Sequence, residues 1–180
     1  MRMRIIAGQL GGRWFRADIG ARTHPTAERV RGALFNSLGD LTGRTVLDAF
    51  AGTGAYSFEA ASRGAASVLA IERDHRAQQV IAKNIEELGL AATVKLVKAN
   101  CRTWSQNNPT QQFDIVICDV PYDDLQLSTV SLLTRHVKDN GLMVLSYPGR
   151  ESAPTVNGVV VVDKSKSYGD AALAYYRKAA

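Results

Sequence analysis

The stretch that decides the fold is Asp48-Ala49-Phe50-Ala51-Gly52-Thr53-Gly54-Ala55. It ends an apolar strand expected over 45–50 and leads directly into a helix expected over 55–63. Two glycines separated by one residue let the backbone turn sharply and approach a ligand closely. In an α/β sheet, ligands bind beside such loops at the carboxyl ends of the parallel strands. The stretch therefore predicts a parallel sheet with a binding crevice above this loop.

The chain around this loop alternates strands with helices. We expect strands over 45–50, 68–72, 94–99, 113–119 and 142–147, and helices at about 55–63, 74–88 and 126–138. This alternation is typical of a parallel sheet covered on both faces. Two further strands, over 158–162 and 172–177, have too short a link for a crossover helix, so they form an antiparallel pair. The predicted fold class is α/β, a mostly parallel, Rossmann-like sheet of seven strands with an antiparallel C-terminal hairpin.

The first 40 residues are interpreted as an N-terminal β-hairpin and helix extension. Short strands over 3–7 and 13–17 flank a glycine-rich turn. A helix follows, for which Thr26 is the expected N-cap, and its apolar face is made by Val30, Leu34, Phe35 and Leu38. This spacing directs Arg29 and Arg31 away from the apolar face. We therefore expect an extension over residues 1–40 and a main domain over residues 41–180.

The positive charge of the chain is concentrated in this extension. The net charge is +5, and residues 1–31 contain seven arginines against Asp18 and Glu28, an excess of five. The guanidinium group suits bidentate phosphate contacts and stacking on bases. Clustered positive charge indicates a nucleic-acid partner, although a basic segment that is merely solvated remains the alternative.

The composition indicates an ordinary globular chain. It has 180 residues, 46% of them hydrophobic and 22% charged. No apolar run approaches the roughly 20 residues that span a bilayer, and no export signal is visible, so we expect a cytoplasmic protein that binds no membrane. Cys101 and Cys118 match no metal-ligand spacing, so we expect no metal and two buried thiols. A monomer is the simpler expectation.

Polar residues end the strands on either side of the glycine loop. Glu72 closes the second strand, where a carboxylate can accept both hydroxyls of a ribose. Asn100 follows the third strand, where an amide can hydrogen-bond an adenine edge. Position 57 holds no third glycine and the loop has no Walker lysine, which argues against a dinucleotide or a phosphate-binding loop. The groups predict a pocket shaped for a nucleoside.

The fourth strand ends in the tetrapeptide Asp119-Val120-Pro121-Tyr122. An aspartate at this place lies over the ligand crevice, and the rigid segment after it presents a flat ring. Asp119 and the Val120 carbonyl would accept hydrogen bonds from an amine on a planar substrate, and Tyr122 would stack on that substrate. Rate enhancement would come from positioning and electrostatics.

Together, the glycine loop, Glu72, Asn100 and this tetrapeptide resemble the class I methyltransferases that act on exocyclic amines. The wider chain resembles the RsmD family, guanine-N2 methyltransferases of bacterial small-subunit (16S) ribosomal RNA. Matching motifs span nearly the whole chain in the family's order, and include Arg4-Ile5-Ile6-Ala7-Gly8, Pro25-Thr26, Arg29-Val30-Arg31, Leu34-Phe35-Asn36, Ser62-Arg63-Gly64-Ala65 and Tyr168-Gly169-Asp170.

The resemblance implies roles for particular residues. The catalytic segment would be Asp119, Val120, Pro121 and Tyr122. S-adenosylmethionine would be the cofactor, bound by Asp48, Phe50, Ala51, Gly52, Thr53, Gly54, Glu72, Arg73, Asn100, Cys101 and Asp119. Ribosomal RNA or the small subunit would be the partner, contacted by Arg13, Thr26, Arg29, Arg31 and Tyr168. Arg29 and Arg31 could instead pair with surface carboxylates, and Tyr168 could simply pack. We expect Trp14 and Trp104 to be structural.

Two positions depart from the family pattern. The tetrapeptide of relatives is usually Asp-Pro-Pro followed by Tyr or Phe, whereas this chain has Val120, which loses the fixed φ of proline. Pro121 still holds Val120 in the extended region, so we expect weakened catalysis rather than none. Gly32 stands where relatives typically have glutamate. Two alternatives stay open: methylation of adenine N6 in RNA or DNA, and a catalytically silent RNA-binding or ribosome-assembly protein.

Overall fold

The computed structural model describes residues 1–18 and 25–178, except for the side chains at 25–26 and 162–165. Its helices are α1 (Pro25–Leu38), α2 (Ala55–Ser62), α3 (His75–Glu87), α4 (Cys101–Asn107), α5 (Leu127–Leu133) and the 3-10 turn η1 (Thr134–His136). Its strands are β1 (Arg2–Arg4), β2 (Trp14–Arg16), β3 (Thr45–Asp48), β4 (Ser67–Glu72), β5 (Val94–Lys98), β6 (Phe113–Asp119), β7 (Val137–Pro148), β8 (Val160–Tyr168) and β9 (Ala171–Arg177).

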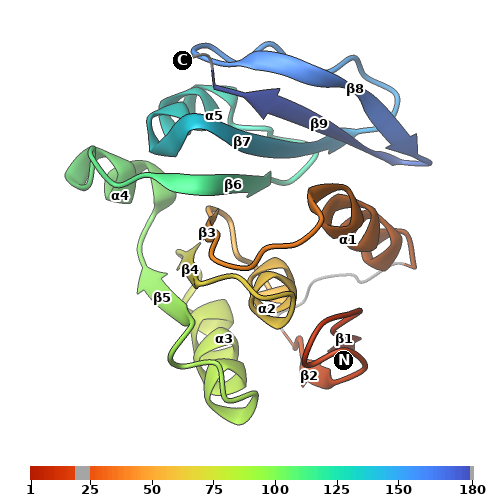
Figure 1. The fold of residues 1–180 in the computed structure, drawn as a ribbon, viewed down its shortest axis with the longest axis vertical. Coiled ribbons are helices and arrows are strands. Elements are labelled where there is room, and N and C mark those ends of the chain that lie inside the picture. The colour runs from red at the N-terminus through yellow and green to blue at the C-terminus, as the bar shows by residue number, and fades with distance from the viewer. Residues whose placement is uncertain (19–24, 179–180) are drawn as a thin grey trace.

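Seven of these strands form one sheet in the order β5-β4-β3-β6-β7-β9-β8 (Figure 1). The first five are parallel, and β9 runs antiparallel to both β7 and β8. The predicted fold class, including the antiparallel C-terminal hairpin, is confirmed. Because β3 lies centrally and the order reverses beside it, the loops after β3, β4 and β6 meet at one edge of the sheet.

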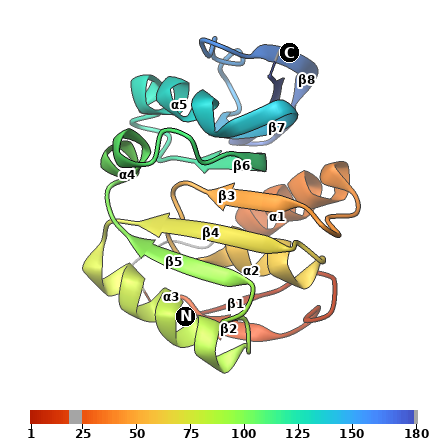
Figure 2. The ribbon, with the colours of Figure 1, turned by 60° about the vertical axis from the view of Figure 1, so that its left-hand side comes forward.

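Alternate residues of the sheet enter two separate cores, one on each face. Figure 2 shows the helices that cover the sheet. Ile115 and Ile117 of β6 pack with the hairpin, α1, α2 and α3, whereas Val116 and Cys118 pack with α4 and α5. This division follows from the period of two in a strand. It explains why β6 is apolar without interruption from Ile115 to Cys118.

The predicted N-terminal hairpin is present but shorter, with Arg2 opposite Arg16 and Arg4 opposite Trp14. Its Phe15 packs edge-on against Phe58 of α2, with 5.1 Å between the ring centroids. The hairpin therefore shares the core of the sheet. The expected N-cap at Thr26 is wrong, because α1 already begins at Pro25, a residue whose φ suits a first helical turn.

A buried carboxylate fastens the hairpin to α2. Glu59 is fully buried, and its two oxygens accept hydrogen bonds from the backbone N–H groups of Ile6 (2.9 Å) and Ala7 (3.1 Å). Arg63 donates to the same carboxylate at 2.8 Å, and the Arg31 guanidinium lies 3.7 Å away. We call Glu59, Arg31 and Arg63 the buried clasp. It ties residues 6–7 to the helix that follows the glycine loop.

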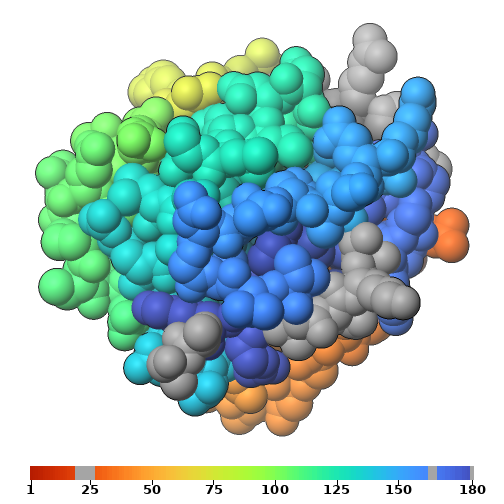
Figure 3. Space-filling model, turned by 90° about the horizontal axis from the view of Figure 1, so that it is seen from above, coloured from red at the N-terminus to blue at the C-terminus, as the bar shows by residue number. Residues whose placement is uncertain are grey.

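Two helices differ from those expected from the sequence. Helix α4 was not predicted, and it forms because the Asn100 side chain accepts hydrogen bonds from the N–H groups of Arg102 and Thr103. The expected helix over 126–138 ends early, since β7 already begins at Val137. Figure 3 looks onto the β8 edge and shows α1 (orange) emerging beside the blue C-terminal strands.

Candidate active site

A cavity of about 390 Å³ opens at the carboxyl ends of β3, β4, β5 and β6. This volume lies within the roughly 300–1,000 Å³ of small-molecule sites. Its walls include seven of the residues predicted to bind a cofactor, namely Phe50, Gly52, Glu72, Arg73, Asn100, Cys101 and Asp119, and Pro121 of the tetrapeptide. The residues that the sequence brought to this edge are therefore together in space.

The two glycines of the loop have different roles. Gly54 has a φ of 83°, and a Cβ there would lie 2.7 Å from the ring of Phe58, so this glycine is needed for the turn and for packing. Gly52 has a φ of 55° and lines the cavity, and a Cβ there would meet no atom within 4 Å. A ligand can therefore approach the backbone at Gly52 without obstruction. Ala51 and Thr53 are not among the lining residues, and Thr53 accepts from the N–H of Ala55.

Glu72 joins the cavity wall to the glycine loop. Its Oε1 accepts a hydrogen bond from the Gly52 N–H, and its Oε2 accepts one from the Asp74 N–H, both at 2.8 Å. A carboxylate oxygen can accept more than one hydrogen bond, so the group retains acceptor capacity toward the cavity. Glu72 thus holds the loop in shape while it offers an acceptor to a ligand.

Asp48 lies beneath the cavity and is not part of its wall. Its side chain is fully buried, and its Oδ2 accepts a hydrogen bond from Ser57 at 2.7 Å. Burial raises the pKa of Asp48 to about 7, and the nearby carboxylates of Asp119 and Glu72 add to the rise. Asp48 is therefore a buried carboxyl group close to two acidic residues of the cavity wall, Glu72 and Asp119.

Several lining residues escaped the sequence reasoning. Asp74 caps α3, Arg102 and Thr129 lie on α4 and α5, and Gln126 holds a left-handed conformation just before α5. Arg102 could have been found only by anticipating α4, whose signal was the N-cap at Asn100. Cys101 lines the cavity, and burial raises its pKa to about 12, so the group is a neutral thiol.

Asp119 and Tyr122 meet at Ser146, which lies opposite Asp119 on the neighbouring strand β7. The Tyr122 hydroxyl and the Ser146 hydroxyl are 2.6 Å apart. Burial raises the pKa of Asp119 to about 6, and a hydrogen bond from Ser146 opposes this rise. Tyr122 remains 39% exposed, so its ring is accessible to a substrate, whereas Val120 is buried.

The predicted RNA-binding residues lie in different surroundings. Arg29 and Tyr168 line a second groove of about 540 Å³, in which the Arg29 guanidinium lies 5.8 Å from the centre of the Tyr168 ring. Arg31 does not point away from the core as expected, because it is only 2% exposed and donates to the Arg4 carbonyl. Arg13 is exposed. The side chain of Thr26 lies outside the described residues.

Comparisons with known proteins identify the family of this chain. A family described as Conserved hypothetical protein 95 matches residues 3–177. The chain belongs to this family. Within it, "Ribosomal RNA small subunit methyltransferase D" of Escherichia coli (strain K12) is 32% identical over 182 residues, which covers 99% of this chain and 91% of that protein. "Putative rRNA methyltransferase YlbH" of Bacillus subtilis (strain 168) is 28% identical, covering 98% and 99%.

A solved structure, "Putative methyltransferase yhhF from Escherichia coli", superimposes with a TM-score of 0.86 at 30% identity, covering 100% of this chain and 99% of that one. The resemblance of this chain to RsmD-type methyltransferases is therefore confirmed. Within residues 1–18 and 25–178, no helix has the length and apolar character needed to cross a bilayer. No group of three or more metal-ligating side chains occurs in that part of the chain.

Proposed function

We propose that this protein transfers a methyl group from S-adenosylmethionine to the exocyclic N2 amine of a guanine in bacterial 16S ribosomal RNA. Membership of the RsmD/YlbH-type family supports the coarser part, an S-adenosylmethionine-dependent RNA methyltransferase. The observation that carries the proposal is the position of Asp119, which lines the same cavity as Gly52 and Glu72. A group that can hold an amine therefore borders a site that can hold a nucleoside.

The residues of the cavity fit this cofactor. Gly52 leaves room for close approach to the backbone, and Glu72 offers carboxylate lone pairs to ribose hydroxyls. Asn100 would contribute less than the sequence suggested, because its Oδ1 already caps α4. When bound, S-adenosylmethionine would supply a methyl group activated by its sulfonium.

The tetrapeptide would prepare the acceptor amine. The Asp119 carboxylate and the Val120 carbonyl would each accept a hydrogen bond from the amine, which keeps the nitrogen lone pair from delocalising into the base. The Tyr122 ring would stack on the base and hold it in one plane. Preorganised acceptors of this kind lower the barrier because they need not reorganise during reaction.

The remaining predictions belong to the same proposal. Residues 1–40 would form the RNA-binding extension of a catalytic domain over residues 41–180, with Arg13, Arg29 and Tyr168 on the RNA side. The protein would act as a cytoplasmic monomer on ribosomal RNA or the small subunit. Arg31 would support RNA binding only indirectly, by holding the hairpin in place through the buried clasp, since its side chain is buried.

Transfer of tritiated methyl groups tests the proposal. The acceptors would be small ribosomal subunits from a strain that lacks the enzyme, followed by mass spectrometry of the nucleosides, with Asp119→Ala as the inactive control. We expect N2-methylguanosine from the wild type alone. N6-methyladenosine as the sole product would instead establish the adenine activity. A wild type as inactive as Asp119→Ala, with RNA binding intact, would establish the silent protein.

A further inference from the structure

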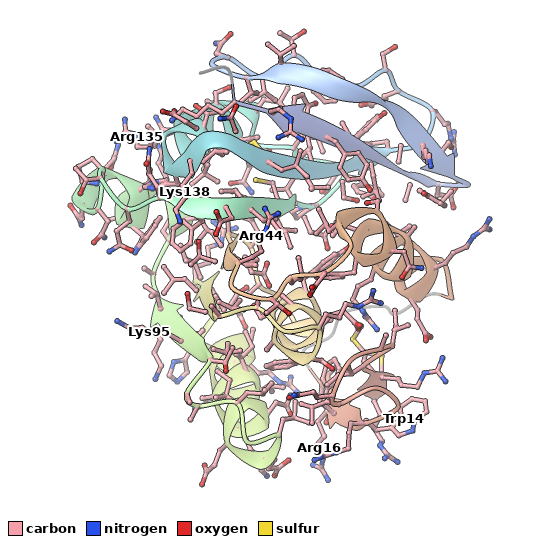
Figure 4. All side chains as sticks on the ribbon, in the orientation of Figure 1. Trp14, Arg16, Arg44, Lys95, Arg135 and Lys138 are labelled. Carbon is pink, nitrogen blue, oxygen red and sulfur yellow. The ribbon has the colours of Figure 1, made fainter. Side chains whose placement is uncertain are left out.

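The outward face of the hairpin combines arginines with an exposed indole. Residues two apart in a strand share a face, and the pairing places Arg2 opposite Arg16 and Arg4 opposite Trp14. These four side chains are exposed, whereas Phe15 on the opposite face is buried. Figure 4 shows Trp14 and Arg16 at the outer rim of the molecule. We call Arg2, Arg4, Trp14 and Arg16 the hairpin face.

Trp14 is 52% exposed, so its ring is accessible at the surface, although the sequence favours a structural role for this residue. The guanidinium carbons of Arg2 and Arg4 lie 5.5 Å and 6.0 Å from the centre of its ring. These cation–π contacts hold two positive charges beside an indole that remains accessible. Arg4 is further oriented by its ion pair with Glu28 at 2.7 Å. The exposed indole of Trp14 is thus flanked by two positively charged side chains.

We propose that the hairpin face binds an unpaired RNA nucleotide whose base stacks on Trp14. Aromatic rings flanked by arginines are the usual platform for single-stranded nucleic acid, because every base has a π-face and the phosphates need cations. Glu28 pairs with Arg4 and Asp18 interacts with Arg16, but the three arginines of the hairpin face outnumber these two carboxylates, and the net positive charge favours a polyanion as the occupant. Bases within a duplex are already stacked, so the platform selects unpaired segments. The inference rests on the proposed function, since it requires RNA as the partner.

Fluorescence of Trp14 provides the first test. The chain contains two tryptophans, so Trp104→Phe leaves Trp14 as the only one. We expect a single-stranded RNA oligomer to quench this fluorescence on binding, and a duplex of the same sequence to quench it far less. Equal quenching by both, or binding without any quenching, would overturn the proposal.

Affinity measurements provide the second test. Trp14→Ala should weaken binding of the single-stranded oligomer roughly tenfold or more, and Trp14→Phe should recover most of the affinity. Arg16→Gln should reduce the slope of the logarithm of the binding constant against the logarithm of the salt concentration by about 0.7. Lys95 is an exposed cation on β5, and Lys95→Ala should change neither the affinity nor this slope. An unaltered affinity of Trp14→Ala, or an equal loss for single strands and duplexes, contradicts stacking.

The proposed function fails separately, when the wild type binds no RNA of any kind or binds no S-adenosylmethionine. Cofactor affinity should be the same in all five variants, because Trp14, Arg16, Lys95 and Trp104 are not part of the cavity wall.

A different observation, at the end of β6, carries a second inference. Ser146 is nearly fully buried and contacts both Tyr122 and Asp119 through its single hydroxyl. An ionised carboxylate only accepts hydrogen bonds, so Ser146 must donate to Asp119. The serine oxygen must then accept the proton of the Tyr122 hydroxyl. The three residues form a directed chain, from Tyr122 to Ser146 to Asp119.

We infer that Ser146 is a positioning residue for methyl transfer, because it fixes the Tyr122 ring relative to the Asp119 carboxylate. Val120 lies between these two residues and lacks the rigid φ of proline, so the restraint that Ser146 supplies comes from outside the loop. The other titratable groups that face Asp119 are Asp48 on β3, Tyr56 on α2, and Cys118 on its own strand.

A double-mutant cycle tests this inference. Ser146→Ala should lower kcat roughly tenfold with little change in the KM for S-adenosylmethionine, and Ser146→Thr should restore it. Tyr122→Phe should cost much less in the Ser146→Ala background than alone, because the chain is already broken. The acidic limb of the pH profile should move to higher pH in Ser146→Ala, since the carboxylate loses a donor.

Additive effects of the two substitutions would contradict the inference. A loss of kcat accompanied by lower thermal stability and an unchanged acidic limb would show that Ser146 only packs. The rates of the single and double variants should be measured by single-turnover kinetics, which separate the chemical step from RNA binding.

Discussion

At the carboxyl edge of the sheet, acidic groups lie in or beneath a cavity, whereas the hairpin face presents arginines to solvent. Asp48 is buried, Glu72 and Asp119 line the cavity, and each of the three accepts hydrogen bonds from this chain. Arg2 and Arg16 are exposed on a two-stranded hairpin. The difference teaches that the proposed chemistry would depend on a few fixed groups, while the proposed RNA binding would be shared among several exposed cations. Substitutions should therefore act sharply in the first region and gradually in the second.

Breaking the buried clasp should have the largest effect, because it joins the two regions. Glu59→Ala leaves the buried guanidinium of Arg31 and the N–H groups of Ile6 and Ala7 without this carboxylate. Removing one partner of a buried ion pair costs about 3–5 kcal/mol, which urea denaturation would measure. Glu28→Ala, which removes only the exposed pair with Arg4, should cost about 1 kcal/mol or less. Equal losses would show that the hairpin is not held by the clasp.

Removing the Asp119 carboxylate should lower the rate of methyl transfer and leave RNA binding unchanged. Asp119→Asn replaces a carboxylate with an amide that can also donate, so it misdirects one of the two acceptors of the amine. We expect kcat to fall roughly 10²- to 10³-fold, with the affinity for RNA unchanged in a filter-binding assay. An equal loss of RNA affinity would mean that the two regions are not separable.

The buried carboxylate beneath the cavity should show in the pH dependence of stability. The folded-state pKa of Asp48 is raised to about 7, so the folded protein retains a proton that the unfolded chain has released. Stability from this group is therefore complete below pH 4 and declines as the pH rises toward 7. The difference in unfolding free energy between wild type and Asp48→Asn should shift by roughly 3–4 kcal/mol between pH 4 and pH 7, at about 1.4 kcal/mol for each unit by which the pKa is raised. A constant difference would refute the raised pKa.

Restoring the family proline should have the smallest effect. Val120→Pro, with Pro121 following, fixes one more φ angle and should stabilise the folded chain by about 0.4–1 kcal/mol if the backbone already fits. We expect kcat to rise only a few-fold, because Ser146 already restrains the flanking residues. A gain of a hundredfold or more would show that the loop of the wild type is poorly ordered for catalysis.

The sequence predicted the sheet well because β-strand patterns are local. The apolar run before Asp119 and the glycines at 52 and 54 determine where strands end, whatever packs around them. Arg31 was misjudged for the opposite reason. Its burial depends on where the hairpin docks, and that is decided by Glu59, more than 25 residues further along the chain.

Ser146 and Arg102 illustrate a second limit. Ser146 occupies an ordinary position in an apolar strand, and only the register between β6 and β7 brings it beside Asp119. Arg102 reaches the cavity through a helix that depends on the capping side chain of Asn100. Motifs thus identified the residues at the strand ends. The residues beside them, such as Ser146 and Arg102, depend on tertiary contacts that no local sequence pattern predicts.

The docking of α1 on β9 constrains the order in which the protein can be made. The Ser37 and Tyr175 hydroxyls are 2.6 Å apart, and they join a helix near one end of the chain to a strand near the other (Figure 1). During synthesis, α1 leaves the ribosome long before β9 exists, so its partner surface is missing for most of translation. Contacts of such large sequence separation form late and slowly. The nascent chain therefore spends that interval with an apolar helix face uncovered, and a chaperone that shields it should raise the yield of folded protein.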